Sequence, residues 1–323
     1  WMDRYGDHFI DASGWSASML ANTVRADGID ILVDLSGFTG NNRLIAFAHK
    51  PAPIQIQAWG YVLGTASPAT DVIFADPIVC PPDVRETMSE RVVDLPSLLS
   101  YLPRPDLPEA NDLPCAQPEA AGPIFSVFQR ASKVNADTLA VWRQILERLP
   151  NATISFKGGD YSPKVRTDIA AALEPFLNRI VFDFQGEHKQ HMESYAQVDL
   201  ALDPWPQTGG VSTLESLWMG VPCVTFIGPR MIQRTSASFL TTIGYQELIA
   251  TSREDYIEKA IAYVTTKRDR LSQMRKECRA TMKASPIMTG YVEAVEAKYR
   301  MLWREWCAEK SNEGTSWRSQ RTA

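Results

Sequence analysis

Apolar residues along this chain form short continuous runs, separated by stretches in which they recur with helical spacing. Runs typical of buried strands occupy residues 29–35, 54–59, 71–75, 124–129, 153–157, 180–184, 200–202 and the stretch from residue 222. Amphipathic stretches typical of helices occupy residues 13–28, 42–49, 136–148, 164–177, 188–198, 211–220 and 291–306, and residues 230–280 are mainly helical. Strands that alternate with helices predict βαβ units and parallel sheets.

A Pro-rich stretch divides this pattern into two parts. Residues 96–122 lack both strand and helix periodicity, so we interpret them as a connector. We expect an incomplete amino-terminal Rossmann-like lobe over residues 1–95 and a complete nucleotide-binding lobe over residues 123–285. A terminal helix at 286–310 and a disordered tail at 311–323 complete the predicted organisation.

Composition excludes several classes of protein. A net charge of −5, with no long Lys/Arg run, argues against a nucleic-acid partner. The five cysteines are scattered without a CxxC pair, which indicates free thiols in a reducing cytoplasm. No apolar run approaches the roughly 18 residues that span a bilayer, and the start has no signal-peptide pattern. The chain opens on Trp1 rather than Met, so we expect it to be part of a longer protein.

The most informative segment is DLALDPWPQTGGVSTLESLWMGVPCVTF, residues 199–226. It predicts a strand, a loop that contains Gly209 and Gly210, and a helix from Val211. Free amide groups, the hydroxyls of Ser212 and Thr213 and the positive end of the helix dipole suit an anion such as a nucleotide diphosphate. Glu215, one turn in, suits a ribose diol. Ser212-x-x-Glu215 also matches a capping box with a purely structural role, so both interpretations stay open.

Two other loops follow predicted strands and point to the same sheet edge, because parallel sheets bind ligands at the carboxyl ends of their strands. Lys133 follows the strand at 124–129 and could neutralise a diphosphate, although a solvated loop lysine is the alternative. His188 and His191 follow the strand at 180–184. Their spacing could bind a metal, but no third ligand is evident, and contact with a base is the better functional interpretation. A surface His191 without a role is the alternative.

Several motifs are absent from the sequence. Without an Asp-x-Asp motif, a metal that holds the diphosphate is not indicated. The chain contains no G-x-S-x-G, P-loop lysine motif or G-x-G-x-x-G, which disfavours hydrolases, NTPases and dinucleotide-dependent oxidoreductases. Asp203 closes a strand before Pro204 and is interpreted as a turn anchor.

Taken in order, these motifs resemble the O-linked N-acetylglucosamine transferase and SPINDLY family, particularly its bacterial members. The resemblance covers residues 8–306 and depends on HFID (8–11), DGIDILVDLSGFTGNNRLIAFAHKPAPIQ (27–55), WGY (59–61), SER (89–91), FQRASK (128–133), His191 followed by DLALDPWPQTGG (199–210), and LWMGVPCVTF (217–226). Each piece alone is weak, but the joint match is highly specific.

The resemblance implies a GT-B fold, in which two Rossmann-like lobes hold a nucleotide sugar in the cleft between them. It implies an inverting, metal-independent transfer to Ser or Thr hydroxyls of proteins. It also implies tetratricopeptide repeats upstream in the full-length chain. UDP-N-acetylglucosamine is the first choice of donor, with UDP-glucose and GDP-fucose behind it, and no other cofactor is expected.

Family roles carry over by position. Lys133 matches the lysine that contacts the diphosphate, and His191 matches the histidine near the base and diphosphate. Glu215 matches the carboxylate that holds the ribose, and Arg43 lies near the acceptor side. Other matched positions are Gln129 and Arg130 before the lysine, Trp59 and Gly60 near the sugar, and Gly209, Gly210, Val211, Ser212 and Thr213 in the phosphate loop.

Departures from the family pattern weaken some of these assignments. Val211 removes a hydroxyl from a loop that is commonly rich in threonine, and His188 replaces the base-contacting lysine of animal relatives. The usual GYPGT run is altered at residues 60–65. The first half of the amino-terminal lobe, with its histidine, would lie before Trp1. No general base is assigned; His8 is a distant candidate.

These observations predict a protein O-glycosyltransferase. Two alternatives stay open: a catalytically silent, nucleotide-sugar-binding scaffold, and a metabolic GT-B enzyme that acts on a small acceptor.

Overall fold

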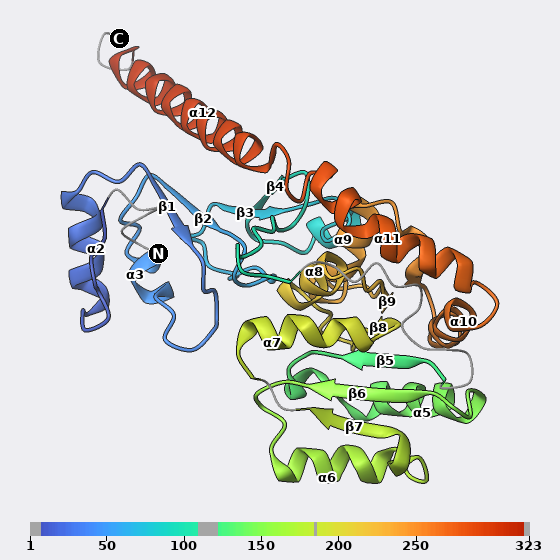
Figure 1. Ribbon diagram of the computed structural model, residues 1–323. Helices are drawn as coiled ribbons and strands as arrows, with labels where there is room; N and C mark the ends of the chain where they lie inside the picture. The colour runs from blue at the N-terminus through green and yellow to red at the C-terminus, as the bar shows by residue number, and fades with distance from the viewer. Residues whose placement is uncertain (1–7, 109–121, 184–185, 320–323) are drawn as a thin grey trace. The chain divides into compact units, whose positions relative to one another are not determined.

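The computed structural model describes residues 8–108, 122–183 and 186–319 (Figure 1). The chain divides into two compact units. We call Trp1–Ala75, Arg85–Leu95 and Val292–Ala323 the first lobe, and Asp76–Val84 and Pro96–Tyr291 the second lobe.

The first lobe is built on a parallel four-stranded sheet in the order β1-β2-β3-β4. Its strands are β1 (Ile31–Asp34), β2 (Ile54–Gln57), β3 (Val72–Ala75) and β4 (Arg91–Asp94), and its short helices are α2 (Ala17–Ala26) and α3 (Leu44–Ala48). Helix α12 (Tyr291–Ser319) belongs here too. Its Tyr299 ring lies 5.7 Å from that of Phe74, and Glu305 pairs with Arg91 at 2.6 Å.

The second lobe is built on a parallel six-stranded sheet in the order β10-β9-β8-β5-β6-β7. Its strands are β5 (Ile124–Val127), β6 (Thr153–Lys157), β7 (Ile180–Asp183), β8 (Leu200–Leu202), β9 (Cys223–Phe226) and β10 (Ile249–Ala250). The chain adds β6 and β7 on one side of β5, then returns to add β8, β9 and β10 on the other side. The boundary between β5 and β8 is therefore the topological switch point, where open α/β sheets bind ligands.

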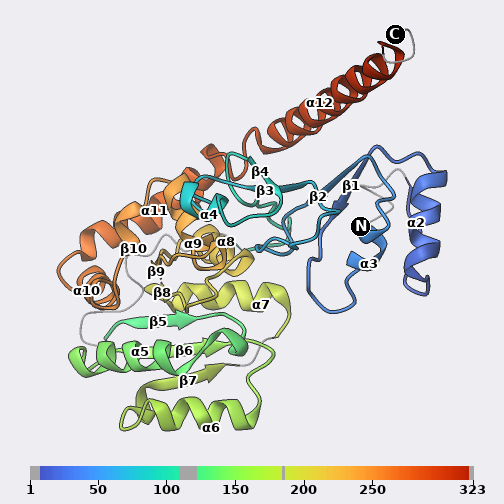
Figure 2. The ribbon, with the colours of Figure 1, turned by 180° about the vertical axis from the view of Figure 1, so that it is seen from behind.

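Helices cover both faces of this sheet, as Figure 1 and Figure 2 show from opposite sides. They are α5 (Ala136–Arg148), α6 (Pro163–Ala172), α7 (His188–Glu193), α8 (Val211–Trp218), α9 (Thr235–Thr242), α10 (Arg253–Val264) and α11 (Arg268–Ala284). Right-handed crossovers put α5 and α6 on one face and α8 on the other. Helix α10 packs against α5, and α11 packs against α8.

The core connects these helices to the switch point. Trp142 of α5 is fully buried, and its Nε1 donates a hydrogen bond to the Tyr256 hydroxyl of α10 at 3.3 Å. The Tyr256 hydroxyl in turn donates to the carbonyl of Asp203, directly after β8, at 3.1 Å. Buried polar groups are thus paired with one another, which fixes the end of β8 from the core side.

The structure corrects four expectations about the elements. Strands β4 and β10 were not predicted, because each is short and lacks a long apolar run. The helix expected over 188–198 ends at Glu193 and continues as the 3₁₀ helix η4 (Ser194–Gln197). The Ser194 hydroxyl bonds back to the Gln190 carbonyl at 3.0 Å, a contact that often bends helices.

The fourth correction concerns the terminal helix α12. It does not end at residue 310 but runs to Ser319, because adding a residue to a formed helix costs far less free energy than starting one, and no proline interrupts it. The expected disorder of 311–323 is therefore wrong up to that residue, and residues 320–323 lie outside the described chain. The described part of the connector, residues 96–108, belongs to the second lobe, and residues 109–121 lie outside the described chain. None of the described helices is long and apolar enough to cross a membrane.

Candidate functional site

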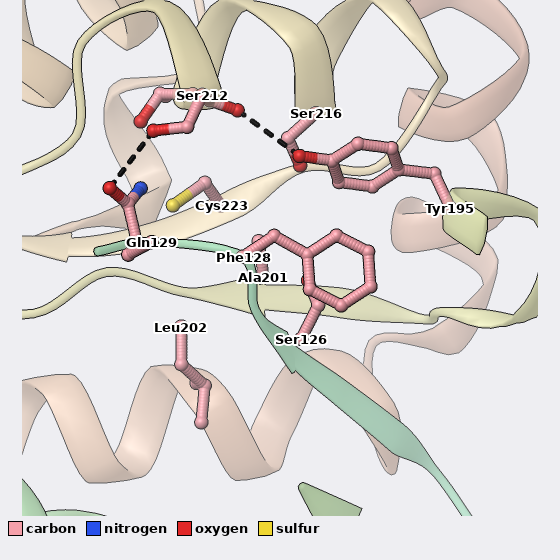
Figure 3. Close-up of a pocket in the computed structure, with 10 residues that line it drawn as sticks. Ser126, Phe128, Gln129, Tyr195, Ala201, Leu202, Ser212, Ser216 and Cys223 are labelled. Atoms are coloured by element: carbon pink, nitrogen blue, oxygen red, sulfur yellow. Dashed lines mark hydrogen bonds between the residues drawn. The ribbon is translucent and has the colours of Figure 1, made fainter. Parts of the chain in front are cut away.

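The loops after β5 and β8 meet at the switch point. The β5 loop carries Gln129 and Lys133, and the β8 loop carries residues 208–213. Two hydrogen bonds join them directly. The Lys133 ammonium donates to the Thr208 carbonyl at 3.0 Å. The Ser212 hydroxyl donates to the Gln129 Oε1 at 2.9 Å, the bond that Figure 3 shows. Residues 75 or more positions apart in the sequence thus form one array.

Lys133 is held at the end of the 3₁₀ helix η2 (Ala131–Lys133), half-buried. Its ammonium also donates to the Gln129 Oε1 at 3.0 Å, so two of its three N–H groups have acceptors in the described part of the chain. Burial lowers the pKa of Lys133, Asp203 opposes that shift, and the exposed Arg130 adds to it. The solvated-loop interpretation of Lys133 is therefore wrong, and its third N–H has no acceptor among the described residues.

Asp203 anchors the glycine loop, as the sequence indicated. Its carboxylate is fully buried and accepts from the Gly209 amide at 2.8 Å and from the Thr225 hydroxyl at 2.7 Å. Burial raises the pKa of Asp203 despite these bonds. The Ser236 hydroxyl donates to the Gly209 carbonyl at 3.2 Å and lies 3.0 Å from the Thr213 hydroxyl. The amide and the carbonyl of Gly209 are thus both held by buried side chains, those of Asp203 and Ser236.

Helix α8 begins at Val211 with Gly210 as its N-cap, and no side chain caps it within the described residues. The Ser212 hydroxyl bonds Gln129 instead of a backbone amide, so the capping-box interpretation is wrong. An uncapped helix start leaves amide groups and a positive dipole end for an anion. Val211 itself is 57% exposed, so its side chain takes no part in the core.

Helix α7 supplies the third side of the array. His188, its first residue, bonds the Glu215 carboxylate of α8 through Nε2, at 2.7 Å. His191 is only 6% exposed and packs against the rings of Phe128 and Tyr195, with centroid distances of 5.5 and 5.7 Å. The interpretation of His191 as a surface residue is therefore wrong. Within residues 8–108, 122–183 and 186–319, no three His, Cys, Asp or Glu side chains gather as a metal site.

Lys157, at the end of β6, contacts the residue that follows α7, and it was not identified from the sequence as part of the site. Its side chain is 5% exposed, and its ammonium donates to the Asp183 carboxylate at 2.6 Å and to the Ser194 hydroxyl. Burial, then the charge of Lys157 and that of His188, lowers the pKa of His191 to about 4. A lysine at the end of a strand was the only signal of this residue in the sequence.

The buried His191 predicts a loss of stability in mild acid. Between these two pKa values, His191 is protonated in the unfolded chain, where its pKa is 6.5, but neutral in the folded protein, where its pKa is about 4. As pH falls from 6.5 to 4, the free energy of unfolding should drop by up to about 3 kcal/mol from this group. Urea unfolding against pH measures the drop. His191→Phe should lose this part of the pH dependence, whereas the exposed His49→Gln should keep it; equal profiles in all three would contradict the prediction.

A narrow pocket lies between the β5–β8–β9 part of the sheet and α8 (Figure 3). Its volume of about 10 Å³ is far below that of a nucleotide site. It is lined by Ser126, Phe128, Gln129, Tyr195, Ala201, Leu202, Ser212, Thr213, Ser216 and Cys223. This pocket is therefore too small to hold a nucleotide.

The first lobe holds the residues that were expected on the sugar and acceptor side. Arg43 donates to the carbonyls of Ala12 and Ser13 at 2.8 Å and of Trp15 at 3.1 Å, so its guanidinium organises residues 12–15. Trp59, two residues after the end of β2, has a positive φ of 60°. The sugar- and acceptor-side roles of Arg43, Trp59 and Gly60 stay predictions, and His8 is exposed.

Two buried residues that the sequence did not reveal shape the loop after Trp59. Gln57 donates through Nε2 to the carbonyls of Tyr61, at 2.9 Å, and Leu63. The Glu90 carboxylate accepts from the amides of Thr65 and Ala66, at 2.5 and 3.1 Å. The altered run at residues 60–65 is thus firmly held.

Gly60 is required by its close approach to the β1 strand end. A Cβ at this position would lie 1.6 Å from the Leu35 carbonyl oxygen, a backbone atom that cannot rotate away. We expect Gly60→Ala to lower the free energy of unfolding by about 3 kcal/mol. Gly40→Ala is the control, because nothing lies within 4 Å of its Cβ, and its change should stay within about 0.5 kcal/mol. Similar values for both in urea unfolding would refute the steric argument.

Two parallel α/β lobes, one with a glycine loop and a helix start at its switch point, give this chain the GT-B fold. The family model of glycosyl transferase family 41 matches residues 2–101 and 116–294. The chain belongs to this family.

The similar proteins agree with this membership. Two proteins named "Probable UDP-N-acetylglucosamine–peptide N-acetylglucosaminyltransferase SPINDLY" are 34% identical (Oryza sativa subsp. japonica) and 32% identical (Arabidopsis thaliana) over 94% of this chain. The chain spans only 33% and 34% of their lengths. An O-GlcNAc transferase mutant from Thermobaculum terrenum matches in structure with a TM-score of 0.85 and 32% identity, over 94% of this chain and 58% of that one.

Proposed function

We propose that this chain is the catalytic part of an inverting protein O-glycosyltransferase that moves a sugar from a nucleotide diphosphate donor to Ser or Thr hydroxyls. The observation that carries the proposal is the array at the switch point, in which Lys133 and Ser212 both donate to the Gln129 Oε1 beside the uncapped start of α8. A cation, a hydroxyl and a helix start are suited to a diphosphate.

In the proposed reaction, the acceptor hydroxyl attacks the anomeric carbon on the face opposite the nucleotide. The bond between that carbon and the phosphate oxygen breaks, its electron pair leaves with the diphosphate, and the configuration inverts. The Lys133 ammonium and the α8 amides stabilise the charge that develops on the leaving group. The acceptor's proton passes to water or to a phosphate oxygen of the donor; no base is assigned among the described residues, and no metal is invoked.

The donor and acceptor are inferred from the relatives. Both SPINDLY proteins carry UDP-N-acetylglucosamine and peptide in their names. We propose UDP-N-acetylglucosamine as the donor, with Glu215 holding the ribose and His191 lining the nucleoside side. UDP-glucose and GDP-fucose are the next candidates.

Calorimetric titration of the chain with UDP, then GDP, tests the donor site. Wild type should bind one of them, and Lys133→Ala should weaken that binding. Lys164→Ala should not, because Lys164 is 83% exposed and pairs with Asp168 of its own helix, α6. Transfer to protein acceptors is then measured with the preferred nucleotide sugar, and the anomeric configuration of the product is read by NMR.

The alternatives predict other outcomes. Binding of UDP without transfer or donor hydrolysis would indicate a silent scaffold, and transfer to small acceptors alone would indicate a metabolic enzyme. Binding of neither nucleotide would overturn the proposal.

A further inference from the structure

The hydrogen bond between His188 and Glu215 suggests a role for His188 in addition to those assigned above. His188 Nε2 and Glu215 Oε1 lie 2.7 Å apart, and the two side chains are 32% and 14% exposed. A carboxylate accepts hydrogen bonds but does not donate them, so Nε2 carries the hydrogen and donates it. One oxygen of Glu215 is thus occupied and the orientation of its carboxylate is restricted.

This bond is not needed to tether α7 to α8. The Tyr195 hydroxyl, in η4 directly after α7, donates to the Ser212 carbonyl at the start of α8 at 3.3 Å. The Tyr195 ring is buried and packs on Phe128, with a centroid distance of 4.8 Å. The bond from the partly exposed His188 imidazole to Glu215 is therefore a second link between these elements, and its specific effect is to fix the orientation of the Glu215 side chain.

An oriented carboxylate matters most to a ligand with vicinal hydroxyls. A free glutamate must lose rotamer freedom when it binds, whereas a fixed one has already lost it. Its remaining oxygen, Oε2, then has a defined direction toward a hydroxyl donor. A site built to hydrogen-bond a hydroxyl discriminates against analogues that lack it, because a buried polar group is left unpaired.

We propose that His188 is a positioning residue that holds the Glu215 carboxylate for the ribose diol and thereby selects ribonucleotide donors over 2′-deoxyribonucleotides. The inference rests on the proposed function, in which Glu215 contacts the ribose. Within the described residues His188 Nδ1 makes no hydrogen bond, so the bond from Nε2 to Glu215 is the hydrogen bond that fixes the imidazole.

The test is the ratio of the dissociation constants of 2′-deoxy-UDP and UDP, measured by calorimetry; GDP and 2′-deoxy-GDP replace them if wild type prefers guanine. Wild type should prefer the ribonucleotide by about 10- to 100-fold, the value of one hydrogen bond to a charged group. His188→Phe should lower this ratio to near one. His188→Leu serves the same purpose if the Phe variant does not fold.

Two further variants separate positioning from a structural role. His188→Gln places an amide N–H near the position of Nε2 and should restore most of the ratio. Lys189→Ala changes an exposed neighbour on the same helix and should leave the ratio intact.

A wild-type ratio in both His188→Phe and His188→Leu would overturn the inference while nucleotide binding itself still supports the proposed function. Failure of wild type to bind either ribonucleotide would overturn both.

Discussion

Replacing Lys133 by alanine should slow sugar transfer by about 10²- to 10³-fold, the effect of removing one group that stabilises developing charge in a preorganised site. The ammonium is held by Gln129 and Thr208, and its third N–H is the one that the proposed mechanism directs to the leaving diphosphate. The loss should appear mainly in kcat, because charge grows on the leaving group as the bond breaks. Initial rates against donor concentration measure the split.

Lys133→Arg is the informative companion. It keeps the charge but not the compact ammonium that the two acceptors hold, so it should recover only part of the rate. Lys164→Ala should be indistinguishable from wild type. A normal kcat in Lys133→Ala would remove the central residue from the mechanism.

Replacing Gly209 by alanine should reduce nucleotide affinity by about 10- to 100-fold, since displacements on the order of 1 Å in a site can cost that much. The added Cβ would lie 2.0 Å from the Thr213 hydroxyl and 2.6 Å from the Gln129 Nε2. Both are side-chain ends that can move, so the fold should survive while the array is displaced. Calorimetry with UDP and urea unfolding measure the two effects separately.

Gly40→Ala is the matched control, because it is also a Gly→Ala change and nothing lies within 4 Å of the Cβ that it adds. Its affinity for UDP should stay within about twofold of wild type, as expected for a surface substitution. If Gly209→Ala bound UDP equally well, the loop geometry would not govern donor binding.

Local sequence features predicted much of the second lobe. Helix α5 was expected at the residues that it occupies, because apolar spacing and the Asn135 cap act within one segment, with the Asn135 side chain accepting from the Thr138 amide at 3.1 Å. Strand β6 was likewise expected over its observed residues. Strand β4 was not predicted, because it has only four residues and two of them are charged.

The site was predictable as a set of loops but not as a set of bonds. That Gln129, Lys133 and Ser212 lie near one sheet edge follows from the strand ends. The choice between a cap and an anion site depended on where the Ser212 hydroxyl points, which tertiary packing decides. Lys157, Gln57 and Glu90 could not be found, because burial and distant partners define their roles and neither leaves a local pattern.

The chain passes between the lobes several times, and this limits which segments relatives can exchange by recombination. The boundary is crossed at residues 75–76, 84–85, 95–96 and 291–292. Inside the second lobe, Asp76 accepts from the Ser238 hydroxyl, and the Ile78 carbonyl accepts from Arg234. A single genetic crossover therefore cannot exchange an intact lobe. A donor-binding half borrowed from a homologue must bring residues 76–84 together with 96–291, or the hybrid inherits mismatched partners at both contacts.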